Sequence, residues 1–349
     1  MSYSVFQADL PREGREIVSF WKRNFPRWPQ SKFEWLYQDN VSGAASCWLV
    51  RDTNDGSIVG STAVFPRTFR VGGRLYRGGI TGGFVVDPRH RTVGPAIMLQ
   101  KATISACDGG QFDFLYGTPN KSSEPVQRRV GYRMVGSEIR LVRVLRSQGY
   151  VKRYVKSALV SHLLGHACDL ALQAIARERR RKPPKSLYKL ETFSTFDERF
   201  DRLWQRSAGQ HDIVGERTSA FLNWRFAECP YAHYKTAALV CTRTGEVDGY
   251  IIYEVEGNVV HVADLFARDT SEVLDRLLAA FLAEQRQSGR EAVNVVYFGN
   301  EAVLRSLAQF GFKTRETVRN IVFYGGSGGD LAAPWKNQTG WHFTAADND

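Results

Sequence analysis

The chain has 349 residues, of which 43% are hydrophobic, and this length suggests about two globular domains. Its formal net charge of +11 favours an anionic partner, such as a phosphate-bearing cofactor, nucleic acid, an acidic protein or an anionic membrane. The five cysteines are scattered and lack the CxxC or CxH spacing of a zinc site, so we expect reduced thiols, no metal and a cytoplasmic location. No apolar run approaches the roughly 18 residues that span a bilayer, and the first twenty residues lack the apolar core of a signal peptide.

The first elements in chain order predict a β-hairpin. Segment 33–40, FEWLYQDN, is followed by residues 47–65, CWLVRDTNDGSIVGSTAVF. The second of these segments reads as a strand, a polar turn containing Gly56, and another strand.

A turn between a strand and a helix follows at residues 80–102. The strand ITGGFVVDP leads into RHRTVGPA and then into a helical apolar pattern. The first N–H groups of a helix have no internal partner and carry positive character, so they attract anions. Gly94 gives an anion access, Pro95 suits a first helical turn because its missing N–H would be unpaired there, and Arg91 adds charge. The turn is therefore either a plain connector, which is the more common role of a glycine near a helix start, or a pyrophosphate site. It lacks both the P-loop and the GxGxxG pattern.

The next strand ends at Asn120 and is followed by a short helix and Gly131–Tyr132. After this segment, residues 151–182 carry apolar positions at helical spacing and have basic ends, and Pro183 ends the pattern. This amphipathic helix either packs across two domains or lies on an anionic membrane surface.

The second half of the chain resembles the first. Trp224 in LNWRFAEC corresponds to Trp35, and residues 237–255 again read as a hairpin. Asn300 precedes Gly311 by the same 11 residues that separate Asn120 from Gly131. The order β-β-β-α-β-α therefore occurs twice, and we interpret the chain as an internal duplication.

The second copy differs at the turn before its helix. Asp269, Ser271 and Glu272 stand there without a glycine, and acids at a helix N-terminus repel a pyrophosphate. We expect this half to bind no cofactor. The Gly-rich, polar residues 326–349 predict a loosely ordered tail.

The segment VDPRHRTVGPA resembles motif A of the GNAT (Gcn5-related N-acetyltransferase) acyltransferases, and NKSSEPVQRRVGY resembles a later segment of that family. The resemblance implies an α/β (α+β) fold of two tandem GNAT-like domains, each with a mixed, mostly antiparallel central sheet flanked by helices. The predicted boundaries are an acyl-CoA-binding N-terminal domain at 1–148, a basic connector helix at 149–188, a degenerate domain at 189–325 and a flexible tail at 326–349.

The resemblance also implies acetyl-CoA, or another acyl-CoA, as the co-substrate. An amine of a small molecule or sugar would attack the thioester directly in a ternary complex. The pyrophosphate would lie on the amides of the motif A turn and the pantetheine along the strand before it. The implied cofactor-binding residues are Val85, Val86, Arg91, Thr92, Val93, Gly94, Ala96 and Asn120.

The acid and base of such a reaction are harder to assign. The family's usual acid tyrosine is replaced by Gln127, and its counterpart in the second half is Leu307. The catalytic candidates are Asp87, as a base or merely a turn cap, Tyr116, as an alternative acid, and Asn120, near the thiol.

Three alternatives remain open from the sequence: a Fem-like aminoacyl-tRNA-dependent transferase, a transferase that takes its acyl group from an acyl-carrier protein, and a non-catalytic CoA-binding module. The intact motif makes a nucleic-acid partner the weaker expectation. Peripheral contact with the inner face of the membrane would involve residues 151–182. The sequence does not indicate an oligomeric state.

Overall fold

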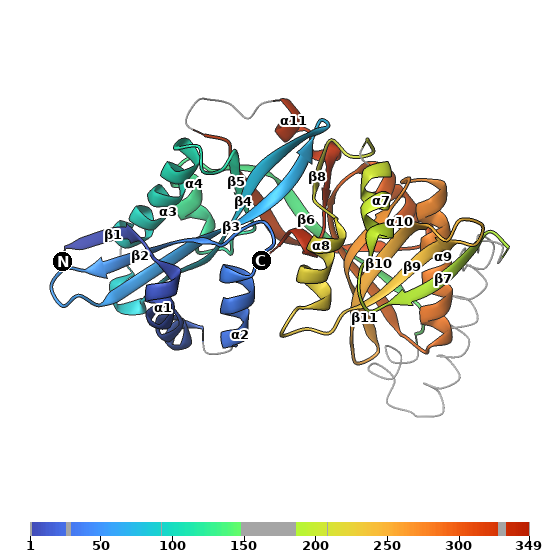
Figure 1. Ribbon diagram of the computed structural model, residues 1–349, viewed down its shortest axis with the longest axis horizontal. Helices are drawn as coiled ribbons and strands as arrows, with labels where there is room; N and C mark the ends of the chain where they lie inside the picture. The colour runs from blue at the N-terminus through green and yellow to red at the C-terminus, as the bar shows by residue number, and fades with distance from the viewer. Residues whose placement is uncertain are drawn as a thin grey trace.

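The computed structural model describes residues 2–25, 29–91, 93–147, 186–207, 209–326 and 333–348. In this part of the chain, fourteen strands form one sheet with the main order β1-β2-β3-β4-β5-β13-β6-β12-β11-β10-β9-β7. The first half of the chain builds one end of the sheet and the second half the other (Figure 1). The expected mixed α/β architecture of two similar units is confirmed.

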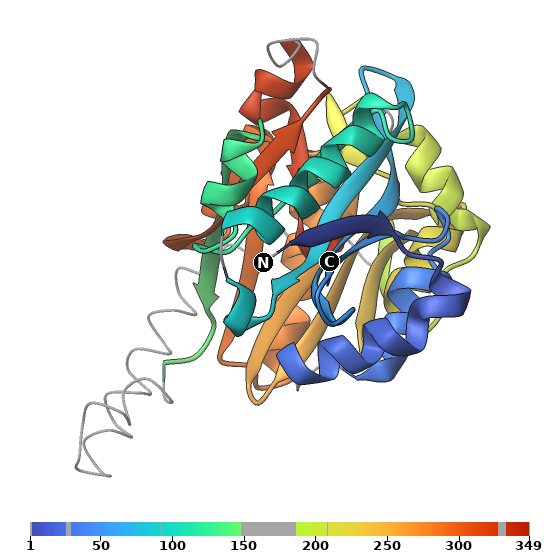
Figure 2. The ribbon, with the colours of Figure 1, turned by 90° about the vertical axis from the view of Figure 1, so that its left-hand side faces the viewer.

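The first half of the chain alternates strands with helices on both sides of the sheet. Its elements are β1 (Tyr3–Gln7), α1 (Leu10–Asn24), α2 (Gln30–Phe33), the π-helix η1 (Glu34–Gln38), β2 (Ser46–Asp52), β3 (Ile58–Val71), β4 (Arg74–Val86), the 3-10 turn η2 (Pro88–His90), α3 (Val93–Asp108), β5 (Phe114–Gly117), α4 (Glu124–Arg129) and β6 (Arg133–Val144). The predicted hairpin is β2 and β3, which pair antiparallel. Helices α1 and α3 cover opposite faces of this part of the sheet (Figure 2).

The second half repeats this order. Its elements are β7 (Tyr188–Phe193), α7 (Glu198–Arg206), β8 (Ile213–Gly215), α8 (Ser219–Leu222), the π-helix η4 (Asn223–Ala227), β9 (Lys235–Cys241), β10 (Val247–Glu256), β11 (Val259–Ala267), α9 (Glu272–Gln287), β12 (Ala292–Gly299), α10 (Glu301–Gln309) and β13 (Lys313–Tyr324). The duplication read from the sequence is thus present in the structure, and even the short π-helices η1 and η4 recur.

The two halves meet at a symmetric pair of tryptophans. Trp35 of η1 and Trp224 of η4 stack with ring centroids 4.7 Å apart and planes 16° apart. The indole of Trp35 donates to the carbonyl of Trp224 at 2.8 Å, and the indole of Trp224 donates to the carbonyl of Trp35 at 3.1 Å. Each half thus presents the same surface to the other, as the subunits of a two-fold dimer do.

The last strands of the two halves are exchanged. β13, from the second half, pairs with β5 through Val322–Tyr324, and β6, from the first half, pairs with β12 through Ile139–Val144. β6 and β13 also pair with each other, antiparallel. Each half therefore completes its part of the sheet with a strand from the other.

The end of the chain differs from the expected loose tail. Residues 333–348 form α11 (Ala333–Lys336), the 3-10 turn η5 (Gln338–Gly340), β14 (Trp341–Phe343) and the 3-10 turn η6 (Ala345–Asp347). Trp341 and Phe343 are fully buried in the core that both halves share. Because large aromatic side chains gain most from leaving water, these two hold a segment whose composition alone suggests disorder.

The expected connector helix, with its membrane contact, falls almost entirely on residues 148–185, which lie outside the described residues. The domain boundaries given above stay a prediction. No helix in the described ranges combines the length and the apolarity that crossing a bilayer requires.

Candidate functional site

The candidate site is a cavity where β4 and β5 separate. These parallel strands pair only between Gly78–Ile80 and Phe114–Tyr116. Beyond that point they diverge, and a cavity of about 570 Å³ opens between them. A cleft of this volume is within the range of small-molecule and cofactor sites.

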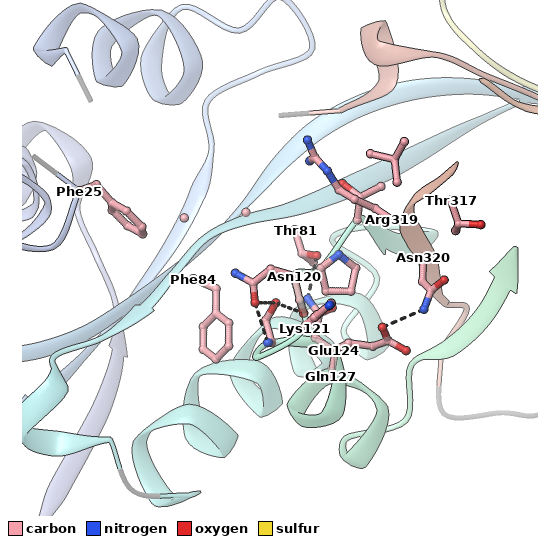
Figure 3. A pocket seen from close by; sticks show the side chains of 16 residues that line it. Phe25, Thr81, Phe84, Asn120, Lys121, Glu124, Gln127, Thr317, Arg319 and Asn320 are labelled. Carbon is pink, nitrogen blue, oxygen red and sulfur yellow. Dashed lines mark hydrogen bonds between the residues drawn. The ribbon is translucent and has the colours of Figure 1, made fainter. Parts of the chain in front are cut away.

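The cavity has walls from both halves of the chain (Figure 3). Its lining residues are Phe25, Thr81, Gly82, Gly83, Phe84, Thr118, Pro119, Asn120, Lys121, Ser123, Glu124, Gln127, Thr317, Val318, Arg319 and Asn320. The last four belong to β13, which the strand exchange brings here from the second half. A site that the sequence places in one domain is therefore completed by the other.

A β-bulge shapes the β4 wall. Ser61 of β3 pairs with Val85 of β4, and Ala63 pairs with Gly82. Two residues of β4, Gly83 and Phe84, therefore lie opposite the single β3 residue between Ser61 and Ala63. Gly83 has φ +58°, and a Cβ there would lie 2.3 Å from the Tyr37 hydroxyl oxygen. Only glycine fits this position, and the bulge redirects the backbone beside the cavity.

β4 continues from the cavity into the predicted pyrophosphate turn. Helix α3 begins at Val93, which places the buried Pro95 in its first turn, where no N–H is needed. Gly94 is exposed, and Ala96 packs against the core beneath α3. Arg91 donates from Nε to the carbonyl of Val86 at 3.3 Å, which fixes the turn. Thr92 lies outside the described residues.

The first N–H groups of α3 therefore lie at an accessible helix start that follows the cavity along the chain. The helix dipole favours a negative charge there, and the exposed glycine leaves room for one. Of the predicted strand contacts, Val86 is buried and Val85 packs half-buried against the core.

Asp87 acts in the structure as the cap of the turn. Its Oδ1 accepts from the N–H of Arg89 at 3.0 Å, and this bond lowers the pKa of Asp87. It is not among the residues that line the cavity. A carboxylate held in its ionised form by a turn is a weak proton acceptor near neutral pH.

The other two catalytic candidates, Tyr116 and Asn120, have different surroundings. Tyr116 is fully buried, and its hydroxyl donates to the carbonyl of Asp347 at 3.0 Å, away from the cavity. Burial raises the pKa of Tyr116. Asn120 does line the cavity, and its Oδ1 accepts from the N–H groups of Ser122 and Ser123 at 2.9 and 3.0 Å. Of the three candidates, the structure places only Asn120 at the cavity.

A polar pair lies where the strands part. Gln127 of α4 donates from Nε2 to Oγ1 of Thr81 on β4 at 3.2 Å, and both side chains are buried. A Cβ on Gly117 would lie 2.4 Å from Thr81 Oγ1, so glycine is required for this pair to form. The sequence pointed to Gln127 only as the place of a missing tyrosine.

The β13 wall adds residues that sequence reasoning missed altogether. Asn320 donates from Nδ2 to Oε2 of Glu124 on α4 at 3.0 Å, which links the two halves across the cavity. Arg319 and Lys121 bring positive charge to the lining. No local pattern signals this contact, because it depends on which strand inserts beside β5.

The equivalent region of the second half holds a smaller cavity of about 370 Å³, lined by residues of β6, β12, α10 and η5. β11 and β12 pair in parallel only through Val259–Val262, and β14 then pairs with the end of β12. At the start of α9, Asp269 Oδ1 accepts from the N–H of Val273 at 2.9 Å. The C-terminal segment thus contributes Gln338 and Thr339 to the wall of this smaller cavity, and a carboxylate caps the helix start that is open in the first half.

Residues 11–135 match a family model described as an acetyltransferase (GNAT) domain. A probable N-acyltransferase of unknown function from Enterococcus faecalis V583 has a similar structure, with TM-score 0.66, 13% identity and coverage of 93% of this chain and 72% of that one. A GCN5-related N-acetyltransferase from Anabaena variabilis ATCC 29413 is also similar, with TM-score 0.65 and 14% identity. The likeness covers 92% of this chain and 72% of that one.

The N-myristoyltransferase of Saccharomyces cerevisiae, solved with bound myristoyl-CoA and inhibitors, is similar with TM-score 0.55 and 10% identity, over 93% of this chain and 80% of that one. A search of curated protein sequences gave no match. At these identities the structural likeness concerns the fold, and it extends over both halves. Among the described residues, no group of three or more His, Cys, Asp or Glu could hold a metal ion.

Proposed function

We propose that this chain, whose residues 11–135 match a GNAT acetyltransferase family model, transfers an acetyl group from acetyl-CoA to an amine of a small molecule or sugar. The observation that carries the proposal is the cavity lined by Thr81–Phe84 of β4, together with the exposed start of α3, which follows β4 in the chain. The start of α3 and the β4 and α4 walls of the cavity lie within residues 11–135, which match the family model, and the β13 wall comes from the second half.

The residues present fit acyl-CoA. The exposed Gly94 at the start of α3 suits a pyrophosphate, and the polar edge formed by Thr81 and Gln127 suits an extended amide-bearing arm. Bound acyl-CoA would supply a thioester. In the transfer, the amine nitrogen bonds to the acyl carbon, the carbon–sulfur bond breaks, and the amine's proton leaves while the thiolate takes one up.

The protein's part is to position the reactants and exclude water. The bulge at Gly83 turns backbone groups of β4 toward the place where the strands part, where N–H groups would stabilise a developing oxyanion. Phe25 and Phe84 supply apolar surface on the same side. The amine would be deprotonated by water or by a group of the acceptor complex, since Asp87 is engaged in the turn.

Isothermal titration calorimetry with acetyl-CoA tests the cofactor assignment. We expect one site per chain with micromolar affinity, because Asp269 caps the helix start of the second half and would repel a pyrophosphate. Gly94→Phe places a ring over the helix start and is expected to abolish the binding. Ser271→Phe adds the same ring at the start of α9 and should leave the affinity unchanged. Absence of heat with wild-type protein would contradict the proposal.

A second candidate is a CoA-binding module without catalysis. It is favoured by one observation, that the hydrogen-bonding groups of Asp87 and Tyr116 are engaged away from the cavity. Thiol release from acetyl-CoA, measured across amines, amino sugars and amino acids, separates the two. A series of acyl-CoAs up to myristoyl-CoA would define the acyl length. Saturable, amine-dependent thiol release would support the acetyltransferase. Binding of acetyl-CoA without thiol release, in the presence of every acceptor class, would support the non-catalytic module.

A further inference from the structure

The buried side-chain amide of Gln127 has a fixed orientation. The hydroxyl of Thr81 donates to the carbonyl of Tyr116 at 3.2 Å, so its single hydrogen is in use. Oγ1 of Thr81 can therefore only accept a hydrogen bond from Gln127. The Gln127 atom that lies 3.2 Å from it must be the amide nitrogen Nε2. This leaves Oε1 of Gln127 as an acceptor directed away from Thr81.

That acceptor has no hydrogen-bond partner among the described residues, although Gln127 is only 4% exposed. A buried acceptor without a donor costs free energy, and native proteins keep few such groups. Gln127 also lines the cavity (Figure 3). The missing donor can therefore come from whatever occupies the cavity.

The second half provides an internal comparison. The position equivalent to Gln127 is Leu307, which is fully buried in an apolar core. There β14 pairs with the end of β12, and a smaller cavity of about 370 Å³ remains beside it, which Leu307 does not line. The glutamine thus lines the larger cavity of the first half, whereas the leucine at the equivalent position faces only apolar core.

We propose that Oε1 of Gln127 is a ligand-binding group that accepts a hydrogen bond from an amide N–H of the pantetheine arm of acyl-CoA. This inference rests on the proposed function, which supplies the ligand. The pantetheine arm has N–H donors along an extended chain, which suits an acceptor placed where two strands part. The nucleotide part of the cofactor would lie at α3 and make no contact with Gln127.

The test compares Gln127→Leu with wild type by calorimetry, using coenzyme A and adenosine 3′,5′-bisphosphate, which is its nucleotide part without the arm. We expect the variant to bind coenzyme A about tenfold more weakly, the effect of one lost hydrogen bond. Its affinity for the bisphosphate should not change. Its thermal midpoint should stay equal or rise, because an apolar side chain replaces an unpartnered acceptor.

Gln100→Leu is the matched control. Gln100 is also fully buried, and its Oε1 also lacks a partner among the described residues, but it does not line the cavity. It should leave the affinity for coenzyme A unchanged.

Equal affinity of wild type and Gln127→Leu for coenzyme A would overturn the inference, and so would an equal loss for both ligands. If wild-type protein binds coenzyme A and only the Gln127 comparison fails, the proposed function stands. If wild-type protein binds no coenzyme A, the proposed function fails and this inference fails with it.

Discussion

Asp347, at the end of the chain, is the residue on which three parts of the molecule converge. Its carboxylate accepts from Arg217 of the second half at 2.7 Å and from Arg67 of the first half at 3.1 Å. Burial raises the pKa of Asp347, but the two arginines outweigh burial and lower it to about 2. Arg217 also pairs with Asp264 at 2.8 Å, so the buried charges largely compensate one another.

His342, close to this network, makes stability depend on pH. Burial and then Arg217 lower its pKa from 6.5 to about 3, so it is neutral in the folded protein. The unfolded chain binds the proton more tightly, so stability is complete above about pH 6.5 and falls as the pH drops toward 3. We expect the urea midpoint to decrease between pH 7.5 and 5, a range in which Asp347 does not titrate.

His342→Gln removes the titrating group and should reduce this loss relative to wild type at each pH. The buried His211, whose pKa burial also lowers, would retain part of the effect. An identical pH dependence in both proteins would show that His342 does not titrate on unfolding.

Among the elements, β14 shows most clearly what the sequence could and could not predict. The glycines around residue 326 and the polar residues after them indicate a loose tail, and the triplet Trp341–Phe343, aromatic at both ends, is too short to predict a strand. β14 is stable because it is buried beside β12 and β8, which are distant in the sequence. A local sequence pattern cannot indicate such a contact. The hairpins and the turn that leads from β4 into α3 are local in sequence, and their secondary structure was predicted correctly. The pyrophosphate site at this turn stays a prediction.

Trp341→Ala tests the importance of this element. Trp341 is fully buried among aromatic rings that include Phe298 and Phe323, so its loss leaves a large cavity. We expect unfolding in urea to require about 3–5 kcal/mol less free energy. Gln338→Ala, at an exposed position of η5, should change the free energy of unfolding by less than about 0.5 kcal/mol. Similar small effects for both variants would show that the C-terminal segment is not part of the core.

At the scale of the whole molecule, the exchanged strands and the paired tryptophans make the two halves interdependent. The sequence predicted two similar units from the spacing of Asn120 and Gly131 and from Trp35 with Trp224. It could not predict the exchange, because β6 and β13 are equally compatible with either partner. Strand pairing of this kind is decided by which surfaces are buried together.

Separate expression of residues 1–147 and 186–349 tests this interdependence. The first fragment lacks β13 and one wall of the cavity, so we expect it to bind no acetyl-CoA and to show no cooperative melting alone. Mixing the fragments should restore both the binding and a single thermal transition. A first fragment that binds acetyl-CoA as tightly as the full chain would show that the exchange is dispensable.

The β13 wall has a consequence for how this protein can diversify. The turn at Gly94 and the β13 wall lie more than two hundred residues apart, in the two similar halves of the chain. Substitutions at Thr317–Asn320 can therefore change the cavity lining without touching the half that carries the turn. The second half, whose own helix start is capped by Asp269, thus still supplies a separately adjustable wall to the cavity of the first.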